Sequence, residues 1–155
     1  ARPKHVLLEH GEVHDENCHA GGGICGHAGL FTTVRDLSRQ ALELCRSVRG
    51  ESDFMPPEIL QRFWTATAVP GASMHLGWDS PSGEPGASHA GDLWPTTGVG
   101  HLGFTGTSLW MVPERGRFVI FFDNRVYYGR HDTQTENKAL RRAIMDSIVE
   151  ALPPL

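Results

Sequence analysis

Hydrophobic positions with helical spacing define two segments in the first half of the chain. Thr33 has capping-box-like spacing with Asp36, and Gly50 is placed to end the segment that follows. One face of that segment is apolar and consists of Leu37, Ala41, Leu44, Cys45 and Val48. Pro56-Pro57 can open a second, shorter helix over residues 58–64, because proline is tolerated in a first turn. The pattern therefore predicts two helices here.

A third amphipathic segment lies near the end of the chain. It begins near Thr133, which has capping-box spacing with Glu136, and it stops at Pro153-Pro154. Its apolar face carries Leu140, Ile144 and Ile148, with Ala143 and Ala151 beside them. We expect this helix to lie on a sheet through that face.

Alternating side chains predict the sheet itself. From Thr105 to Val112 one set of side chains (Thr107, Leu109, Met111) alternates with another (Ser108, Trp110, Val112), as in a strand that faces two environments. Pro113-Glu114-Arg115-Gly116 has turn chemistry, and residues 118–122 form a second, more apolar strand, so the two predict a hairpin.

The remaining segments have the composition of loops. Residues 69–100 are crowded with Gly, Pro and Ser, and only Leu76-Gly77-Trp78 resembles a piece of strand there. Residues 10–29 are rich in Gly and His and show neither helical nor strand periodicity, so we expect an ordered loop.

Length and charge narrow the class of protein. The chain has 155 residues, about the size of one ordinary domain, so residues 1–155 are treated as a single domain. Its formal net charge of −4 includes no run of like charge, which argues against a nucleic-acid or anionic-membrane partner. Its apolar stretches, such as residues 119–122, fall far short of the ~20 residues of a membrane span. The expected ligand is a small molecule or another protein.

Histidine and cysteine residues gather in the first loop and raise a zinc hypothesis. The residues concerned are His10, His14, Cys18, His19, Cys25 and His27. Their spacing matches no standard zinc module, and histidines in Gly-rich loops often serve as hydrogen-bond anchors. An odd number of cysteines, three in all, argues against a disulfide framework and favours free thiols without excluding one bridge. We predict no metal and no other cofactor.

The sequence contains no recognisable serine nucleophile. No Ser is followed three residues later by Lys, no Gly-x-Ser-x-Gly occurs, and no Tyr is followed by x-Asn. Because a nucleophile and its base supply most of an enzyme's rate enhancement, we expect little or no turnover from this chain alone.

Two blocks of sequence nevertheless resemble the serine β-lactamase-like hydrolases. The first is GEVHDEN at residues 11–17, then GGICGHAGLFTT at residues 22–33 with Asp36-Leu37. The second is GHLGFTGTSLW at residues 100–110, followed by Pro113-Glu114 and Asn124-Arg125-Val126. They stand in the family's order, and the resemblance covers residues 11–152. The family includes class C β-lactamases, D-alanyl-D-alanine carboxypeptidases and related esterases.

This resemblance implies a fold and a location. The fold would be α/β, a partial β-lactamase-like fold with an antiparallel sheet flanked by helices, lacking the N-terminal part that bears the nucleophile. The parent protein would be periplasmic or secreted.

The resemblance also implies site residues. The family's Lys/His-Thr-Gly strand motif maps onto His101-Leu102-Gly103, where a donor can hold a substrate carboxylate and glycine lets substrate lie close. The backbone N–H of Phe104 would form half of an oxyanion hole, and Thr105 would contact substrate. His101 and Phe104 are thus the catalytic candidates, and His101, Gly103, Phe104 and Thr105 the substrate-binding ones. The alternative for His101 is a strand-end histidine tied to a neighbouring loop.

Other residues are expected to serve structure. Leu102 replaces the family's Thr, and the loss of a hydroxyl there predicts poor β-lactam turnover. By resemblance His14, Asp15 and His27 brace the first loop, and Cys18 and Cys25 stand where relatives carry small residues, which favours small buried side chains. Cys45 is expected to lie in the hydrophobic core. Trp64, Trp78, Trp94 and Trp110 are expected to be packed, with their indole N–H groups satisfied.

These inferences lead to two functional hypotheses. The first is the C-terminal portion of a β-lactamase-like serine hydrolase that acts on an amide or ester of peptidoglycan or β-lactam type through an acyl-enzyme, and that is inactive alone. Its partner would be the N-terminal part of the parent or a second copy of the chain, because a single terminal helix would leave one sheet face and one edge uncovered. The alternative is a non-catalytic module that uses the cleft for binding or for pairing with a protein. A Ser-x-x-Lys encoded shortly upstream of Ala1 would favour the first.

Overall fold

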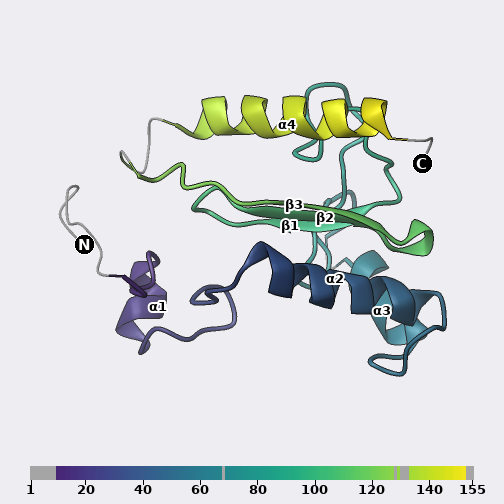
Figure 1. Ribbon diagram of the computed structural model, residues 1–155, viewed down its shortest axis with the longest axis horizontal. Helices are drawn as coiled ribbons and strands as arrows, with labels where there is room; N and C mark the ends of the chain where they lie inside the picture. The colour runs from purple at the N-terminus through teal and green to yellow at the C-terminus, as the bar shows by residue number, and fades with distance from the viewer. Residues whose placement is uncertain (1–9, 68, 128, 130–132, 153–155) are drawn as a thin grey trace.

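The elements of the protein form three layers, with a sheet between helices (Figure 1). The computed structural model describes residues 10–67, 69–127, 129 and 133–152. Helix α4 (Gln134–Ala151) lies over one face of the sheet, and helices α2 (Val34–Val48) and α3 (Pro57–Thr65) lie over the other. A short helix, α1 (Glu16–Ala20), lies to one side of these layers. Among the described helices, none is long and apolar enough to cross a membrane.

The sheet contains three antiparallel strands in the order β1–β2–β3. They are β1 (Val99–Leu102), β2 (Ser108–Val112) and β3 (Arg117–Phe121), and the short 3-10 helix η1 (Pro113–Arg115) joins the last two. The predicted hairpin is therefore confirmed. The predicted bounds of its two strands were wrong, because residues 105–107 belong to the turn between β1 and β2 and residue 122 lies beyond β3. The end of the predicted loop 69–100 also enters β1.

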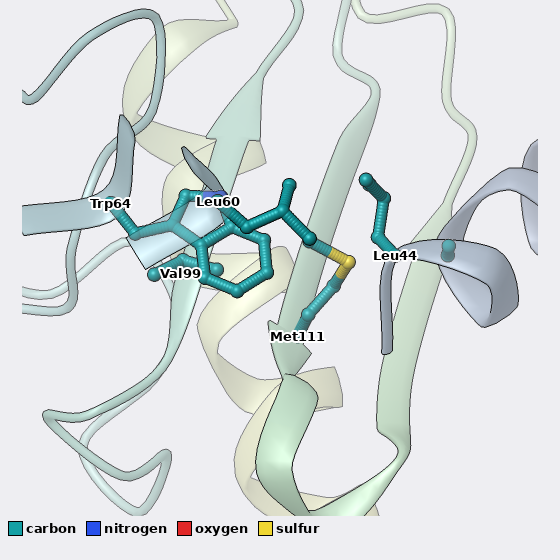
Figure 2. Close-up of a cluster of buried hydrophobic side chains, with 6 residues drawn as sticks. Leu44, Leu60, Trp64, Val99 and Met111 are labelled. Carbon is teal, nitrogen blue, oxygen red and sulfur yellow. The ribbon is translucent and has the colours of Figure 1, made fainter. Parts of the chain in front are cut away.

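Strand β2 alternates between two hydrophobic clusters, as its sequence predicted. Met111 packs toward α2 and α3 in a cluster with Ala41, Leu44, Leu60, Trp64 and Val99 (Figure 2). Trp110 and Val112 pack on the opposite side with Ala90, Trp94 and Met145, the last of which comes from α4. Trp110, Met111 and Met145 are 0% exposed, and full burial of one such side chain contributes about 1.5–3 kcal/mol. The two clusters hold the three layers together.

The tryptophans are packed as expected, but their polar atoms are not satisfied as expected. Trp64, Trp94 and Trp110 are buried, and Trp78 meets Trp64 edge to face with ring centroids 6.0 Å apart. The indole nitrogens of the three buried residues have no hydrogen-bond partner in the described part of the protein. Packing thus determines where these rings lie.

Helices α2 and α3 cover the sheet face that was expected to be bare. Leu44 of α2 and Leu60 of α3 pack in the same cluster as Met111, and each is at most 5% exposed. The prediction of an uncovered sheet face is therefore wrong, since it counted the terminal helix alone. The exposed large apolar side chains include a group near the first block and the β1–β2 turn, namely Ile24, Leu30, Phe31, Phe104 and Phe122.

Gly100 permits a close contact at the edge strand. A Cβ at this position would overlap the Trp110 ring and the Leu109 carbonyl oxygen. On its other side Gly100 forms an antiparallel bridge with Asp79, whose N–H and carbonyl make backbone hydrogen bonds of 2.7 and 2.9 Å to it. Part of the outer edge of β1 is therefore already paired.

The predicted helices in the first half are confirmed. The hydroxyl oxygen of Thr33 accepts the Asp36 N–H at 3.1 Å, which caps α2, and the cap residue Arg49 is followed by Gly50 in a left-handed conformation. Cys45 is fully buried on the apolar face of α2, as predicted.

Helix α4 lies on the sheet, but through a different face from the predicted one. Leu140 is 51% exposed, whereas the buried residues of the helix are Asn137, Arg141 and Met145. The predicted capping box is also wrong, because the Thr133 hydroxyl donates to the Arg125 carbonyl oxygen at 2.7 Å instead of capping the helix. The proposed stop at residues 153–154 lies outside the described residues.

Two loop predictions need correction. Residues 10–29 contain α1, because Asp15 accepts the Cys18 N–H at 2.7 Å and so caps a helical turn. Leu76-Gly77-Trp78 is a bend and no strand, since Gly77 has a φ of 78° and the His75 N–H closes onto the Trp78 carbonyl oxygen at 2.7 Å.

The long loop before β1 is anchored on α4. Arg142 donates to the Gly86 carbonyl oxygen at 2.6 Å and to the Asp92 carboxylate at 2.7 Å. Asp146 accepts the Leu93 N–H at 2.9 Å. The last helix therefore orders a segment that has little regular structure of its own.

Candidate functional site

The turn between β1 and β2 carries most of the predicted site residues. The Gly103 N–H donates to the Thr107 carbonyl oxygen at 2.7 Å, and the Gly106 N–H donates back to the Gly103 carbonyl oxygen at 3.0 Å. A Cβ on Gly103 would overlap the Thr107 hydroxyl, so a larger residue here would force the Thr107 side chain to move. The Thr105 carbonyl oxygen accepts the Arg125 N–H at 2.9 Å. Residues 104 and 105 thus sit at the tip of a firmly bonded turn.

The Phe104 side chain connects the two sequence blocks. Its ring stacks on His14 of the first block, with centroids 5.7 Å apart and an angle of 29° between planes. The guanidinium carbon of Arg125 lies 4.3 Å from the ring centroid, a cation–π contact of about 0.5–2 kcal/mol. Although 56% of Phe104 is exposed, these two neighbours hold it in place.

The larger cavity in this region is lined by both blocks and has a volume of about 940 Å³. His14, Asp15 and His27 line it from the first block, and Phe104 and Thr105 line it from the turn. Its apolar lining comes from Val13, Leu30, Phe31, Leu37, Leu102, Phe122 and Val126. The cavity is mostly apolar with a polar margin, as in many ligand sites.

A smaller cavity of about 300 Å³ lies against β1 and α2. His101 lines it, together with Gln40 and Trp78. Gly103 and Leu102 border both cavities. The four predicted site residues therefore lie next to each other along the chain but divide between two cavities, with His101 at the smaller one and Phe104 and Thr105 at the larger.

His101 is exposed and its ring has a defined orientation. Its Nδ1 lies 2.8 Å from the Leu102 carbonyl oxygen. Because a carbonyl oxygen only accepts, Nδ1 carries the hydrogen, which leaves Nε2 as the acceptor in the neutral ring. The partner belongs to the adjacent residue, so this bond does not tie His101 to another loop. Leu102 packs against the Trp110 cluster, which explains how an apolar residue is accommodated there.

Asp15 and His27 brace the first block as the resemblance implied. The Asp15 carboxylate accepts the Cys18 N–H at 2.7 Å and the His27 Nε2–H at 3.0 Å. The Cys18 N–H and then His27 hold the pKa of Asp15 below its ordinary value. Both side chains are partly exposed, so the contact orders the loop more than it stabilises the fold.

Two histidines of the zinc hypothesis pair with different carboxylates. His19 pairs with Glu12 at 3.3 Å, and His27 pairs with Asp15. Within the described part of the chain, no three His, Cys, Asp or Glu side chains form a group that could hold a metal ion.

A buried polar network behind the turn was not predicted. The Asn137 amide donates to the Asp123 carboxylate, and its oxygen accepts from Arg141. Burial lowers the pKa of Arg141, Arg125 acts in the same direction, and Asp123 opposes them. Asn137 and Arg141 are four residues apart, and that polar spacing on α4 was the signal available in the sequence. Asp123 stands two positions before Arg125, whose N–H bonds to the Thr105 carbonyl oxygen, so the network adjoins the turn that carries Phe104.

Several curated proteins have sequences similar to that of this chain. The curated relatives include two Escherichia coli proteins, from O157:H7 and K12, each named "Putative D-alanyl-D-alanine carboxypeptidase" and each 28% identical over 126 residues. A Salmonella gallinarum protein of the same name is 28% identical over 117 residues, which cover 74% of this chain and 27% of that protein. The Escherichia coli alignments cover 80% of this chain and 29% of each relative, so the chain spans less than a third of their length.

The fold is also found among solved structures. The crystal structure of a β-lactamase from Mycobacterium bovis superposes with a TM-score of 0.61 at 19% identity, over 80% of this chain and 46% of that one. Residues 2–143 match the family described as Beta-lactamase. The sheet with its flanking helices, the two ordered blocks and this match together show that the chain belongs to the beta-lactamase family.

Proposed function

We propose that this chain supplies the substrate-facing strand and half of the oxyanion hole of a β-lactamase-like serine hydrolase of the D-alanyl-D-alanine carboxypeptidase kind. The main observation that supports this proposal is the turn after β1, which holds Phe104 and Thr105 at the larger cavity, with His101 at the adjoining one. Family membership and the names of the curated relatives support this class of reaction.

In the proposed reaction a serine from another segment attacks the carbonyl carbon of a peptide or β-lactam amide. The developing oxyanion accepts a hydrogen bond from the Phe104 N–H, the amine leaves with a proton, and water then hydrolyses the acyl-enzyme ester. His101 would bind the substrate carboxylate when protonated, or relay a proton through Nε2 when neutral.

The nucleophile-bearing segment would pack at the rim of the larger cavity. Leu30 is 79% exposed, Phe31 62% and Phe122 38%, and all three line that cavity. Exposed apolar side chains gathered around one cavity are typical of surfaces that another polypeptide covers. We propose the N-terminal part of the parent protein as that polypeptide, with a second copy of this chain as the competitor.

Hydrolysis assays test the catalytic part of the proposal. The chain alone should not hydrolyse a chromogenic β-lactam or a p-nitrophenyl ester above the buffer rate, because it has no Ser-x-x-Lys. Addition of a separately expressed segment that carries Ser-x-x-Lys and Tyr-x-Asn should restore esterase activity. A covalent adduct on a serine of this chain, detected by mass spectrometry, would show that the machinery was misassigned.

A binding experiment tests the site itself. Titration of the chain with N-acetyl-D-Ala-D-Ala should shift the NMR signals of the His101 ring and of the Gly103 and Phe104 amides. His101→Ala should weaken binding, whereas the exposed His10→Ala should not. Binding without restored hydrolysis after complementation would favour the non-catalytic module.

Light scattering tests the second-copy alternative. If two chains pair through this rim, the apparent mass should rise with concentration, and Phe31→Ser should lower it. A monomer at high concentration that binds no hydrophobic dye would show that the rim does not pair.

A further inference from the structure

Two of the three cysteines meet beside the first block. The Cys18 thiol is buried and donates to the Ala28 carbonyl oxygen at 3.2 Å, and the Cys25 N–H donates to the same oxygen at 3.1 Å. The two thiols are close enough for Cys25 to help raise the pKa of Cys18. Cys45 lies apart from them, fully buried on α2. The fold thus brings together two thiols that are seven positions apart.

Glycines clear the space around both sulfur atoms. A Cβ on Gly21 would lie 3.2 Å from the Cys25 Sγ, and a Cβ on Gly29 would lie 3.0 Å from the Cys18 Sγ. The Gly23 N–H donates to the Cys18 carbonyl oxygen at 2.8 Å, which folds the intervening segment back on itself. The backbone therefore already holds the two cysteines in a closed loop.

We propose that Cys18 and Cys25 are a redox pair that closes into an intrachain disulfide, with a low-molecular-weight disulfide such as oxidised glutathione as the oxidant. Cys25 is the more accessible and attacks first, so that its sulfur bonds to one glutathione sulfur and the other leaves as thiol. The Cys18 thiolate then displaces the second glutathione. Two protein thiols lose two hydrogens and two electrons, and one oxidised glutathione becomes two reduced ones.

The order of these two steps follows from the surroundings of Cys18. Burial raises the pKa of the Cys18 thiol, and its contact with Cys25 and the nearby Asp15 charge act in the same direction. A buried thiol with a raised pKa is a poor first nucleophile, but it is well placed to resolve a mixed disulfide on its neighbour.

A bridge here would affect the margin of the larger cavity. It would link α1 covalently to the loop that leads to His27, whose ring hydrogen-bonds to Asp15. Both of these side chains line the cavity. Closure of the loop would also restrict the unfolded chain, so the oxidised form should unfold at a higher temperature than the reduced form.

Peptide mapping tests the proposal on the full chain. No Lys or Arg lies between Cys18 and Cys25, so trypsin leaves both in the peptide of residues 5–35, whereas Cys45 falls in residues 40–46. After incubation with excess oxidised glutathione and alkylation in denaturant, peptide 5–35 should carry no alkyl group and be lighter by two hydrogens. Peptide 40–46 should be alkylated.

Variants make the outcome decisive. Cys45→Ala should still form the bridge and show the rise in melting temperature on oxidation, whereas Cys18→Ser should stop at a glutathione adduct on Cys25 and show no such rise. Peptide 5–35 from the unmodified chain that is alkylated twice, or that keeps glutathione on Cys25 in excess oxidant, would overturn the proposal. So would disulfide-linked dimers through Cys25.

Discussion

The three-layered body and the first block differ in how deeply they bury their largest apolar side chains. In the body Trp110, Met111 and Met145 are 0% exposed, whereas in the first block Ile24 is 87% exposed and Leu30 79%. The body buries its hydrophobic residues in two clusters on either side of the sheet. The first block is ordered by hydrogen bonds around Asp15 and Ala28. A region that is ordered while Ile24 and Leu30 stay exposed keeps these side chains available for another surface.

The largest expected effect is a cavity in the body. Trp110→Ala should lower the free energy of unfolding by about 3–5 kcal/mol, because the ring is fully buried and its neighbours cannot close the space. Phe31→Ala removes a similar ring from the first block and should change it by no more than about 0.5 kcal/mol. Urea denaturation of both variants measures the contrast. Equal losses would mean that the first block has a core of its own.

The buried network on α4 should give the next largest effect. Asn137→Ala leaves both Asp123 and Arg141 without their shared partner, which should cost about 1–3 kcal/mol in urea denaturation. Asn124→Ala, at an exposed neighbouring position, serves as the control and should be close to neutral. If the two variants unfold alike, the network does not stabilise the body.

The cation–π contact that holds Phe104, where the body meets the first block, should be weaker. A double-mutant cycle with Arg125→Leu and Phe104→Leu should give a coupling energy of about 0.5–1 kcal/mol, from the cation–π contact. Arg125→Leu should also shift the NMR signals of the Phe104 ring and of His14. A coupling energy of zero would show that proximity alone joins these side chains.

The smallest effect concerns pH and His89. Burial lowers the pKa of His89, Lys138, Arg141 and Arg142 of α4 act in the same direction, and Asp79 opposes them. The unfolded chain therefore binds the proton more readily, so stability should fall as the pH drops through the ordinary value of 6.5. His89→Gln should reduce the change in the thermal unfolding midpoint between about pH 8 and about pH 5.5. An unchanged slope in this variant would assign the pH dependence to other groups.

Local signals in the sequence predicted the parts of the fold that depend on neighbours in the chain. Thr33 and the apolar face after it were enough to define α2, because capping and periodicity act within a few residues. Strand β1 has only four residues, and its form depends on pairing with β2 and with Asp79. The buried face of α4 was missed for the same reason, since the partner of Asn137 is Asp123 in another segment.

The candidate site shows a similar division. The motif at residues 101–103 and the residues after it could be named from the sequence. Their distribution between two cavities, and the stacking of Phe104 on His14, depend on segments about 90 positions apart that only the fold brings together. Arg125 was visible within a resembling motif, but its role became clear only from its position over the ring.

The anchoring of the long loop on the last helix has a consequence for the order of folding. Residues 86, 92 and 93 bond to Arg142 and Asp146 across 50 to 56 positions of sequence, and this loop leads directly into β1. Contacts over such separations form late, and on the ribosome α4 is the last described helix to emerge. The strand that carries His101 can therefore reach its final position only after α4 has been synthesised. A nascent chain would hold a finished α2 well before it could present a finished site.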